Sequence, residues 1–166
     1  MSLDQLLHTL QDLPLAAAVR GDMPGTEWVF PIIETLHVLA LTLVFGSIAM
    51  VDLRLLGWSS RGVSGARLIR ETLPWTWTAW ICAALTGSLL FLSKAVAYGG
   101  NFEFRMKFVC MALAAVNMLI FHCGPYRRIG DWDMGRPPAA ARLAGAVSMG
   151  LWIAIIFLGR WVGFST

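Results

Sequence analysis

The sequence predicts an all-α membrane protein, a four-transmembrane-helix bundle with an N-terminal amphipathic interfacial helix. The chain of 166 residues is 57% hydrophobic and only 14% charged, whereas soluble domains carry about 25% charged residues. It contains four apolar segments of about 20 residues, the length that a helix needs to cross the hydrocarbon core of a bilayer. These segments are continuously apolar rather than alternating, which argues against a transmembrane β-barrel.

The predicted elements follow one another in a simple order. Residues 2–20 place leucines along one helical face but are too polar to span a membrane, so we expect a helix at the interface, broken near Pro14. The spans are expected at residues 28–51, 75–96, 104–122 and 144–164. A chain of this length is expected to form a single membrane domain, residues 1–166.

Basic residues indicate the orientation of the bundle. The net charge of +3 does not point to a nucleic-acid partner, because the basic residues lie in short loops where they act as topology signals. The positive-inside rule places both termini on the non-cytoplasmic side of a bacterial inner membrane. Residues expected on the cytoplasmic side are Arg54, Arg61, Arg67, Arg70, Arg127, Arg128, Arg136 and Arg142, against Arg20, Lys94, Arg105, Lys107 and Arg160 on the other side.

Two ionisable residues, Glu34 and His37, lie within the first predicted span. They are three residues apart and therefore share a helical face. Arg160, in the fourth span, is expected at a similar depth. Ionisable groups inside a membrane are costly, so they usually face the bundle interior and pair. One interpretation is an interhelical salt bridge between Glu34 and Arg160. The other is a site in which Glu34 orients His37. The two interpretations are compatible with each other.

His37 is the best candidate for a haem ligand. Helical bundles commonly bind haem through an axial imidazole. The basic residues Arg105, Lys107 and Arg160 are expected near the same membrane surface, where they suit haem propionates. Haem b is therefore the expected cofactor, with copper as a weaker alternative. The interpretation without a ligand is a buried histidine that is hydrogen-bonded to a backbone group or to a hydroxyl such as that of Thr35 or Thr42.

His122 ends the third span at the opposite side of the membrane and is the second candidate ligand for haem or a metal. The first and third spans run in the same direction, so His37 and His122 differ in depth by roughly 15 Å. One haem held by both within one chain is therefore not expected. Three arrangements remain open. His37 binds a haem alone or with a sixth ligand other than histidine, each histidine serves a separate cofactor, or a neighbouring subunit supplies a ligand. An interfacial His122 without a ligand role is also open.

Asp52 and Arg54 end the first span. The simplest interpretation is a solvated helix end from which Arg54 extends to the surface, and the alternative is a pair between Asp52 and Arg142. Small residues in the spans are expected to allow close contacts between helices. They are Gly46, Ala49, Gly87, Gly145, Ala146 and Gly150.

The stretches "FPIIETLHVLALTLVFGSIAMVDLRLLG", "FEFRMKF", "FHCGPYRR" and "LWIAIIFLGRWVGF" resemble a family of small bacterial inner-membrane proteins of unknown function with four helices. The resemblance covers most of the chain. It implies that recurrent features of that family match Glu34, His37, Asp52, Arg54, Arg105, Lys107, His122, Arg160 and Trp161. The chain is also loosely similar to b-type four-helix membrane cytochromes. These bind two haems through four histidines, whereas only two candidate histidines lie in the spans here.

The sequence contains no nucleophile–base pair, phosphate-binding loop or paired carboxylates typical of a hydrolase. We therefore expect a haem b-binding inner-membrane protein in electron transfer or redox sensing, with the bilayer and a quinone or redox protein as partners. It is expected to form a homo-oligomer. The alternatives are an oligomeric proton, ion or metal transporter that uses Glu34, His37 and Arg160, and a structural or accessory membrane subunit.

Overall fold

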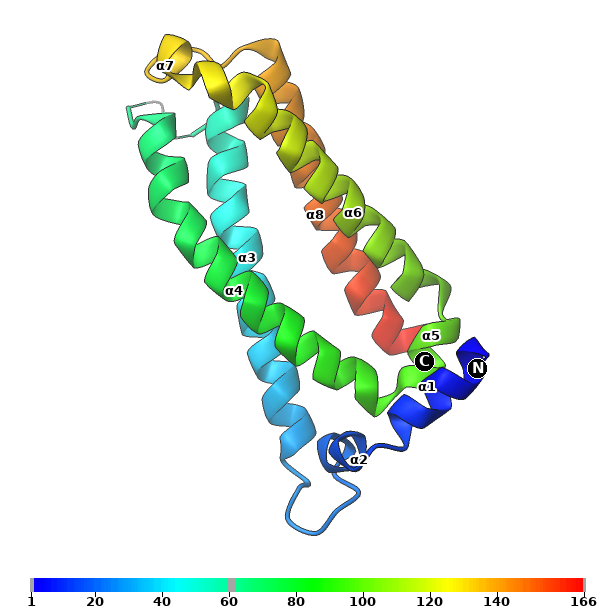
Figure 1. Ribbon diagram of the computed structural model, residues 1–166. Coiled ribbons are helices and arrows are strands. Elements are labelled where there is room, and N and C mark those ends of the chain that lie inside the picture. The colour runs from blue at the N-terminus through cyan, green and yellow to red at the C-terminus, as the bar shows by residue number, and fades with distance from the viewer. Residues whose placement is uncertain (1, 60–61, 166) are drawn as a thin grey trace.

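The structure is a computed structural model that describes residues 2–59 and 62–165. Four long helices dominate it, and the described residues contain no strand, which confirms the predicted fold class (Figure 1). Each long helix is apolar enough to cross a membrane, so the chain is a multi-pass membrane protein. The four helices are α3 (Val29–Leu56), α4 (Gly65–Ser93), α6 (Phe102–Cys123) and α8 (Ala139–Ser165).

The long helices differ from the predicted spans mainly at their ends. α4 begins at Gly65 rather than at residue 75, because its first turns are polar and give no hydropathy signal. α4 ends at Ser93, and the following residues form the separate short helix α5 (Ala95–Gly100). Arg61, one of the residues used to predict the orientation, lies outside the described residues.

The two ends of the bundle are named here after the short helices that lie there. At the α7 end, α7 (Ile129–Trp132) and the 3-10 helix η1 (Pro125–Arg128) connect α6 to α8, and the α3–α4 connection lies beside them. At the α5 end lie α5 and both ends of the described chain (Figure 1).

The predicted interfacial segment forms two helices rather than one, α1 (Leu3–Gln11) and α2 (Pro14–Arg20). Ser2 and Gln5 form a reciprocal capping box at the start of α1. Pro14 begins α2, where its missing N–H costs nothing. Leu7 packs on α5 so closely that a β-carbon on Gly99 would lie 2.5 Å from its Cδ1 atom. The segment is therefore docked on the bundle at the α5 end.

Arg20 fastens these N-terminal helices to the bundle. Its Nη1 atom donates to the carbonyl oxygens of Gln11, at 2.9 Å, and Ser93, at 3.2 Å. Its Nε atom pairs with Asp22 at 2.7 Å. The Oε1 atom of Gln11 also accepts a hydrogen bond from the backbone N–H of Val96. α2 is thus tied to the carboxyl end of α4.

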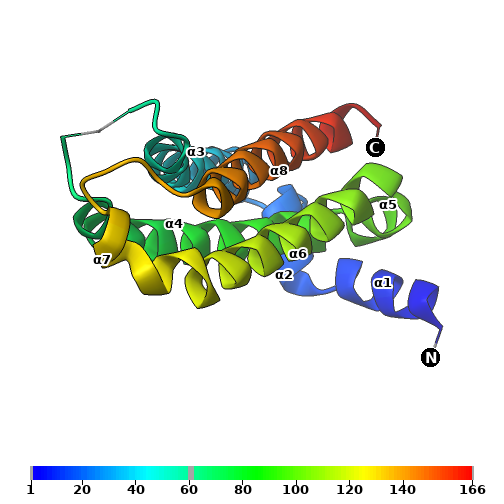
Figure 2. The same ribbon diagram turned by 90° about the horizontal axis from the view of Figure 1, so that it is seen from above.

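The four long helices pack as two pairs. α3 runs along α4, α6 runs along α8, and a contact between α3 and α8 joins the pairs (Figure 2). No comparably extensive contact joins α4 to α6 among the described residues. The bundle is therefore closed on the α3–α8 side and open between α4 and α6 (Figure 1).

Two glycines allow the closest helix approaches, as expected from the sequence. A β-carbon on Gly145 of α8 would lie 3.0 Å from the β-carbon of Leu55 and 3.2 Å from the carbonyl oxygen of Asp52, both on α3. A β-carbon on Gly87 of α4 would lie 2.9 Å from the imidazole of His37. Gly150 of α8, by contrast, faces open space.

Replacing Gly145 by leucine is expected to lower the free energy of unfolding by about 1–3 kcal/mol, because the side chain would meet the backbone of α3. Gly150→Leu is the matched control on the same helix, and it should not destabilise the protein. Thermal unfolding in detergent, followed by circular dichroism, measures both. Equal loss of stability in the two variants would contradict this account of the α3–α8 contact.

Candidate functional site

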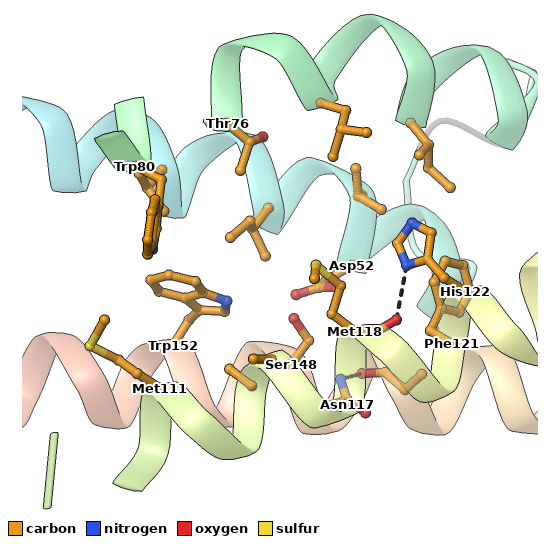
Figure 3. A pocket seen from close by; sticks show the side chains of 18 of the residues that line it. Asp52, Thr76, Trp80, Met111, Asn117, Met118, Phe121, His122, Ser148 and Trp152 are labelled. Atoms are coloured by element: carbon orange, nitrogen blue, oxygen red, sulfur yellow. Dashed lines mark hydrogen bonds between the residues drawn. The ribbon is translucent and has the colours of Figure 1, made fainter. Parts of the chain in front are cut away.

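A cavity of about 520 Å³ lies between α3, α4, α6 and α8. α3 and α8 form its back wall, while α4 and α6 form its two sides. α4 and α6 make little contact with each other among the described residues. Figure 3 shows the side chains that line the cavity.

The end of the cavity near the middle of the bundle is apolar. Trp77 and Trp80 of α4 meet edge to face there, with ring centroids 5.8 Å apart. Trp152 of α8 and Met111 of α6 lie opposite (Figure 3). Large aromatic and thioether side chains make a surface that suits rings and hydrocarbon chains.

The end of the cavity toward α7 is polar. Asp52 lies there with only 4% of its surface exposed, and its Oδ2 atom has no hydrogen-bond partner. Ser148 of α8 points toward this carboxyl group (Figure 3). A buried acceptor without a donor is costly. Asp52 is therefore the feature of this cavity that most needs a further partner.

His122 lies on the same polar part of the cavity wall. Its Nδ1 atom is 2.9 Å from the carbonyl oxygen of Met118. A carbonyl only accepts, so we assign the proton of the neutral ring to Nδ1, which leaves Nε2 as an unprotonated acceptor. The rings of Phe121 and Tyr126 hold the imidazole from two sides.

His37 lies toward the α5 end and does not line this cavity. Its Nδ1 atom is 3.0 Å from the hydroxyl oxygen of Thr86 on α4, which itself donates to the carbonyl of Cys82. Thr86 therefore accepts from Nδ1–H, which leaves Nε2 of the neutral ring unprotonated, and the imidazole also lies within hydrogen-bonding range of the backbone of Ala83. One of the expected hydroxyl partners on its own helix, Thr35, instead donates to Pro31.

Lys107 of α6 lies within electrostatic range of His37 across the bundle. Its ammonium group packs over Gly159 of α8, where a β-carbon would lie 3.4 Å from Nζ. The predicted site residues His37 and Lys107 are thus brought to one level, each over a glycine of the paired helix. His122 lies at the other end of the bundle, as the depth argument predicted.

The other predicted site residues are more scattered. Glu34 and Arg160 are exposed, and the ion pairs of the described residues do not include a pair between them. Arg160 instead lies over the ring of Phe164, 5.1 Å from its centroid. Arg105 donates to the carbonyl of Gly100 at 3.0 Å. Thr86, not Glu34, is therefore the residue that orients His37.

Arg54 is the clearest correction to the sequence interpretation. It does not extend to the surface but is buried, with 2% of its surface exposed. Its guanidinium donates to the carbonyl oxygens of Val63, in the α3–α4 connection, and Asp133, in the α7–α8 connection. The predicted alternative partner of Asp52, Arg142, does not pair with it among the described ion pairs. Arg54 therefore closes the α7 end of the bundle beneath the cavity.

Asp133 supports this closure by capping α4. Its Oδ2 atom accepts from the hydroxyl of Ser64 and its Oδ1 atom accepts from the backbone N–H of Ala66 at 2.8 Å. The Ser64 hydroxyl, followed by the backbone N–H of Ala66, holds the pKa of Asp133 below its ordinary value. The ionised carboxylate thus stabilises the fold.

The stability that Asp133 provides is expected to depend on pH. Its pKa is lower in the folded state, so its contribution is full above the ordinary aspartate pKa of about 4 and is lost as the pH falls through the folded value. In Asp133→Asn, this part of the acid dependence should disappear. In Ser64→Ala the contribution should be smaller and its loss should be complete at a higher pH, because without the main hydrogen bond the folded-state pKa of Asp133 lies closer to its ordinary value. Unfolding in detergent across an acid series measures both, and unchanged profiles would contradict the cap.

The described residues contain no group of three or more histidine, cysteine, aspartate or glutamate side chains placed to hold a metal ion. They also do not place both membrane histidines around one haem. Each histidine nevertheless keeps an unprotonated Nε2 atom, and His37 has Lys107 near it. A group held by both histidines of one chain therefore does not fit, and His37 is the histidine that has a cation, Lys107, within electrostatic range.

The sequence singles out His37, Lys107 and His122, whose ligand roles stay predictions, but it does not reveal the cavity. Asp52 was noticed only as a helix end, although its neighbour Gly145 was recognised as a close-contact residue. The signal available in the sequence was a polar residue near the end of one span together with glycine and serine in another span that ends on the same side.

Comparison with known protein families matches residues 26–165 to a model described as a family of unknown function, DUF6644. No curated protein and no solved structure matches the chain.

Proposed function

Since the chain belongs to DUF6644, a family of unknown function, we propose its role from the cavity: the protein binds a lipid-like molecule that enters from the bilayer between α4 and α6. The observation that carries the proposal is the polarity of the cavity. Its inner part is formed by tryptophan and methionine side chains, and its α7 end holds the buried, unpartnered oxygen of Asp52. An amphiphile matches both parts, with its tail toward the bundle centre.

A quinone is the redox-active member of this ligand class. The hydroxyl groups of its reduced ring can donate to Asp52, and its hydrocarbon tail suits the inner part lined by tryptophan and methionine. Binding of a quinone would fit the predicted role in electron transfer or redox sensing. We further propose that the protein lies in a bacterial inner membrane, as a homo-oligomer, with its α5 end on the non-cytoplasmic side.

Quenching of tryptophan fluorescence tests the proposal. A brominated long-chain alcohol, titrated into the protein in detergent, should quench emission saturably because its bromine atoms reach Trp152. Replacing all three lining tryptophans, Trp77, Trp80 and Trp152, by phenylalanine should remove most of the saturable part. Trp28→Phe, at an exposed position outside the cavity, is the control and should retain it. Quenching that rises linearly with probe, without saturation, would contradict a defined site.

Binding of haem b is a second candidate function, supported by the unprotonated Nε2 atom of His37 and the nearby Lys107. His37 would be the axial ligand and Lys107 would neutralise a propionate. Haem would supply one-electron transfer at that level of the bundle.

Purified protein, produced with an ample haem supply, is then expected to show a Soret band. His37→Ala should abolish the band, and His122→Ala should leave it unchanged, because His122 lies at the other end of the bundle. Thr86→Val should shift the band or weaken it, since the bond that orients His37 is lost. A colourless wild-type protein, or a band retained in His37→Ala, would rule out this candidate.

A further inference from the structure

The polar end of the cavity restricts what kind of head group can bind there. Among the described residues that line the cavity, Asp52 is the one acidic side chain, and the lining contains no lysine or arginine. An anionic head group would therefore meet a carboxyl group and no cation. The lining also lacks the bidentate cation that usually recognises a phosphate or carboxylate.

Several donors at the polar end of this wall are used within the protein. An amide proton of Asn117 goes to the carbonyl of Ala144 at 2.9 Å. The hydroxyl of Thr76 goes to Ser47 or to the carbonyl of Thr72. His122 donates its Nδ1 proton to Met118.

Acceptors remain after these bonds are counted. The Oδ2 atom of Asp52 has no partner, and Nε2 of His122 is unprotonated once Nδ1 donates. Asp52 is more than nine-tenths buried and lines the cavity, so a head group that reaches it must do so within the cavity. The polar end of the wall thus offers acceptors to a ligand, while the indole N–H groups of Trp77, Trp80 and Trp152 are the further donors of the lining.

We propose that the cavity selects amphiphiles whose head group donates hydrogen bonds and carries no negative charge, a hydroxyl or an amine, and that this head group binds Asp52. This inference rests on the proposed function, since it specifies the ligand of the same site. A reduced quinone meets the requirement, whereas a fatty-acid carboxylate does not. The preference arises from the acceptors at the α7 end. The apolar walls do not contribute to it, because they accept any alkyl chain.

A competition series of single-chain amphiphiles tests this selectivity. An alcohol, an amine, a methyl ester and a carboxylate with the same alkyl chain are compared for displacing the brominated alcohol, at a pH where the free carboxylate is ionised. The alcohol and the amine should displace the probe at concentrations about tenfold lower than the ester or the carboxylate, as expected for one hydrogen bond to a buried acidic group.

Two variants assign the selectivity to Asp52. In Asp52→Asn the side-chain amide supplies its own donor, so the advantage of the alcohol over the ester should fall to within a few-fold. Glu34→Gln, which changes an exposed acidic residue of the same helix outside the cavity, should keep the wild-type order.

The outcomes separate this inference from the proposed function. If all four amphiphiles displace the probe equally, or the carboxylate does so best, the head-group selectivity is wrong while a ligand site remains. If the probe shows no saturable binding, both are wrong. If Asp52→Asn does not fold, the order of the four competitors on the wild-type protein still decides the question.

Discussion

Replacing Arg54 by alanine is expected to lower the free energy of unfolding by about 3 kcal/mol, the largest effect on stability that we predict. The guanidinium is buried and donates to the carbonyl oxygens of Val63 and Asp133, which belong to two different connections. Its removal leaves both acceptors without their charged donor and opens a void at the α7 end. Denaturant unfolding in detergent measures the loss.

Two further variants sharpen this prediction. Arg54→Lys keeps the charge but loses the planar fork that reaches two carbonyls, so most of the destabilisation should remain. Arg70→Ala removes an exposed arginine of α4 and should change stability little. If Arg54→Ala is as stable as Arg70→Ala, the guanidinium does not hold the two connections together.

Replacing Ala115 by phenylalanine is expected to weaken binding of the brominated alcohol at least about tenfold, the largest effect on binding. Ala115 is a small residue on the α6 side of the cavity, so a phenyl ring there occupies space that the ligand needs. The fold should persist, because the ring enters an existing void rather than a packed core. Saturable fluorescence quenching measures the affinity.

The adjacent position provides the control for this substitution. Val116 is half exposed and does not line the cavity. Val116→Phe adds a phenyl ring to the same helix and should leave affinity unchanged. Equal affinity in Ala115→Phe and the wild type would show that the probe binds elsewhere.

The spans were predictable because their physical cause is local. An apolar stretch of about 20 residues must cross the bilayer whatever its neighbours do, so α3, α6 and α8 were located well. The interruption between α1 and α2 was also predictable, because Pro14 favours the first turn of a helix. The first turns of α4 were missed, since the polar residues after Ser64 form a helix outside the apolar stretch.

The site was less predictable because its contacts join distant parts of the chain. Thr86 lies 49 positions from His37, and hydropathy does not reveal which hydroxyl faces which ring. Arg54 was interpreted as a surface residue because the sequence does not show that two loops fold over it. The separation of His37 from His122 was predictable, since helix rise alone sets their depths.

The cavity was missed for a related reason. Its volume depends on the lack of close contact between α4 and α6, and each helix by itself resembles an ordinary span. Gly145 was recognised as a close-contact residue. The sequence does not show which helices pair, so it could not reveal that α8 approaches Asp52 at this glycine.

Photoaffinity mapping in lipid vesicles tests the central claim, that a bilayer molecule occupies the cavity, most directly. A long-chain alcohol with a photoreactive group on its chain is activated in the vesicles, and the labelled residues are identified by mass spectrometry. The account predicts labels on Met111 and Trp152 that an excess of unlabelled alcohol removes. Labels confined to outward-facing residues such as Leu39 and Ile153, and insensitive to competitor, would contradict it.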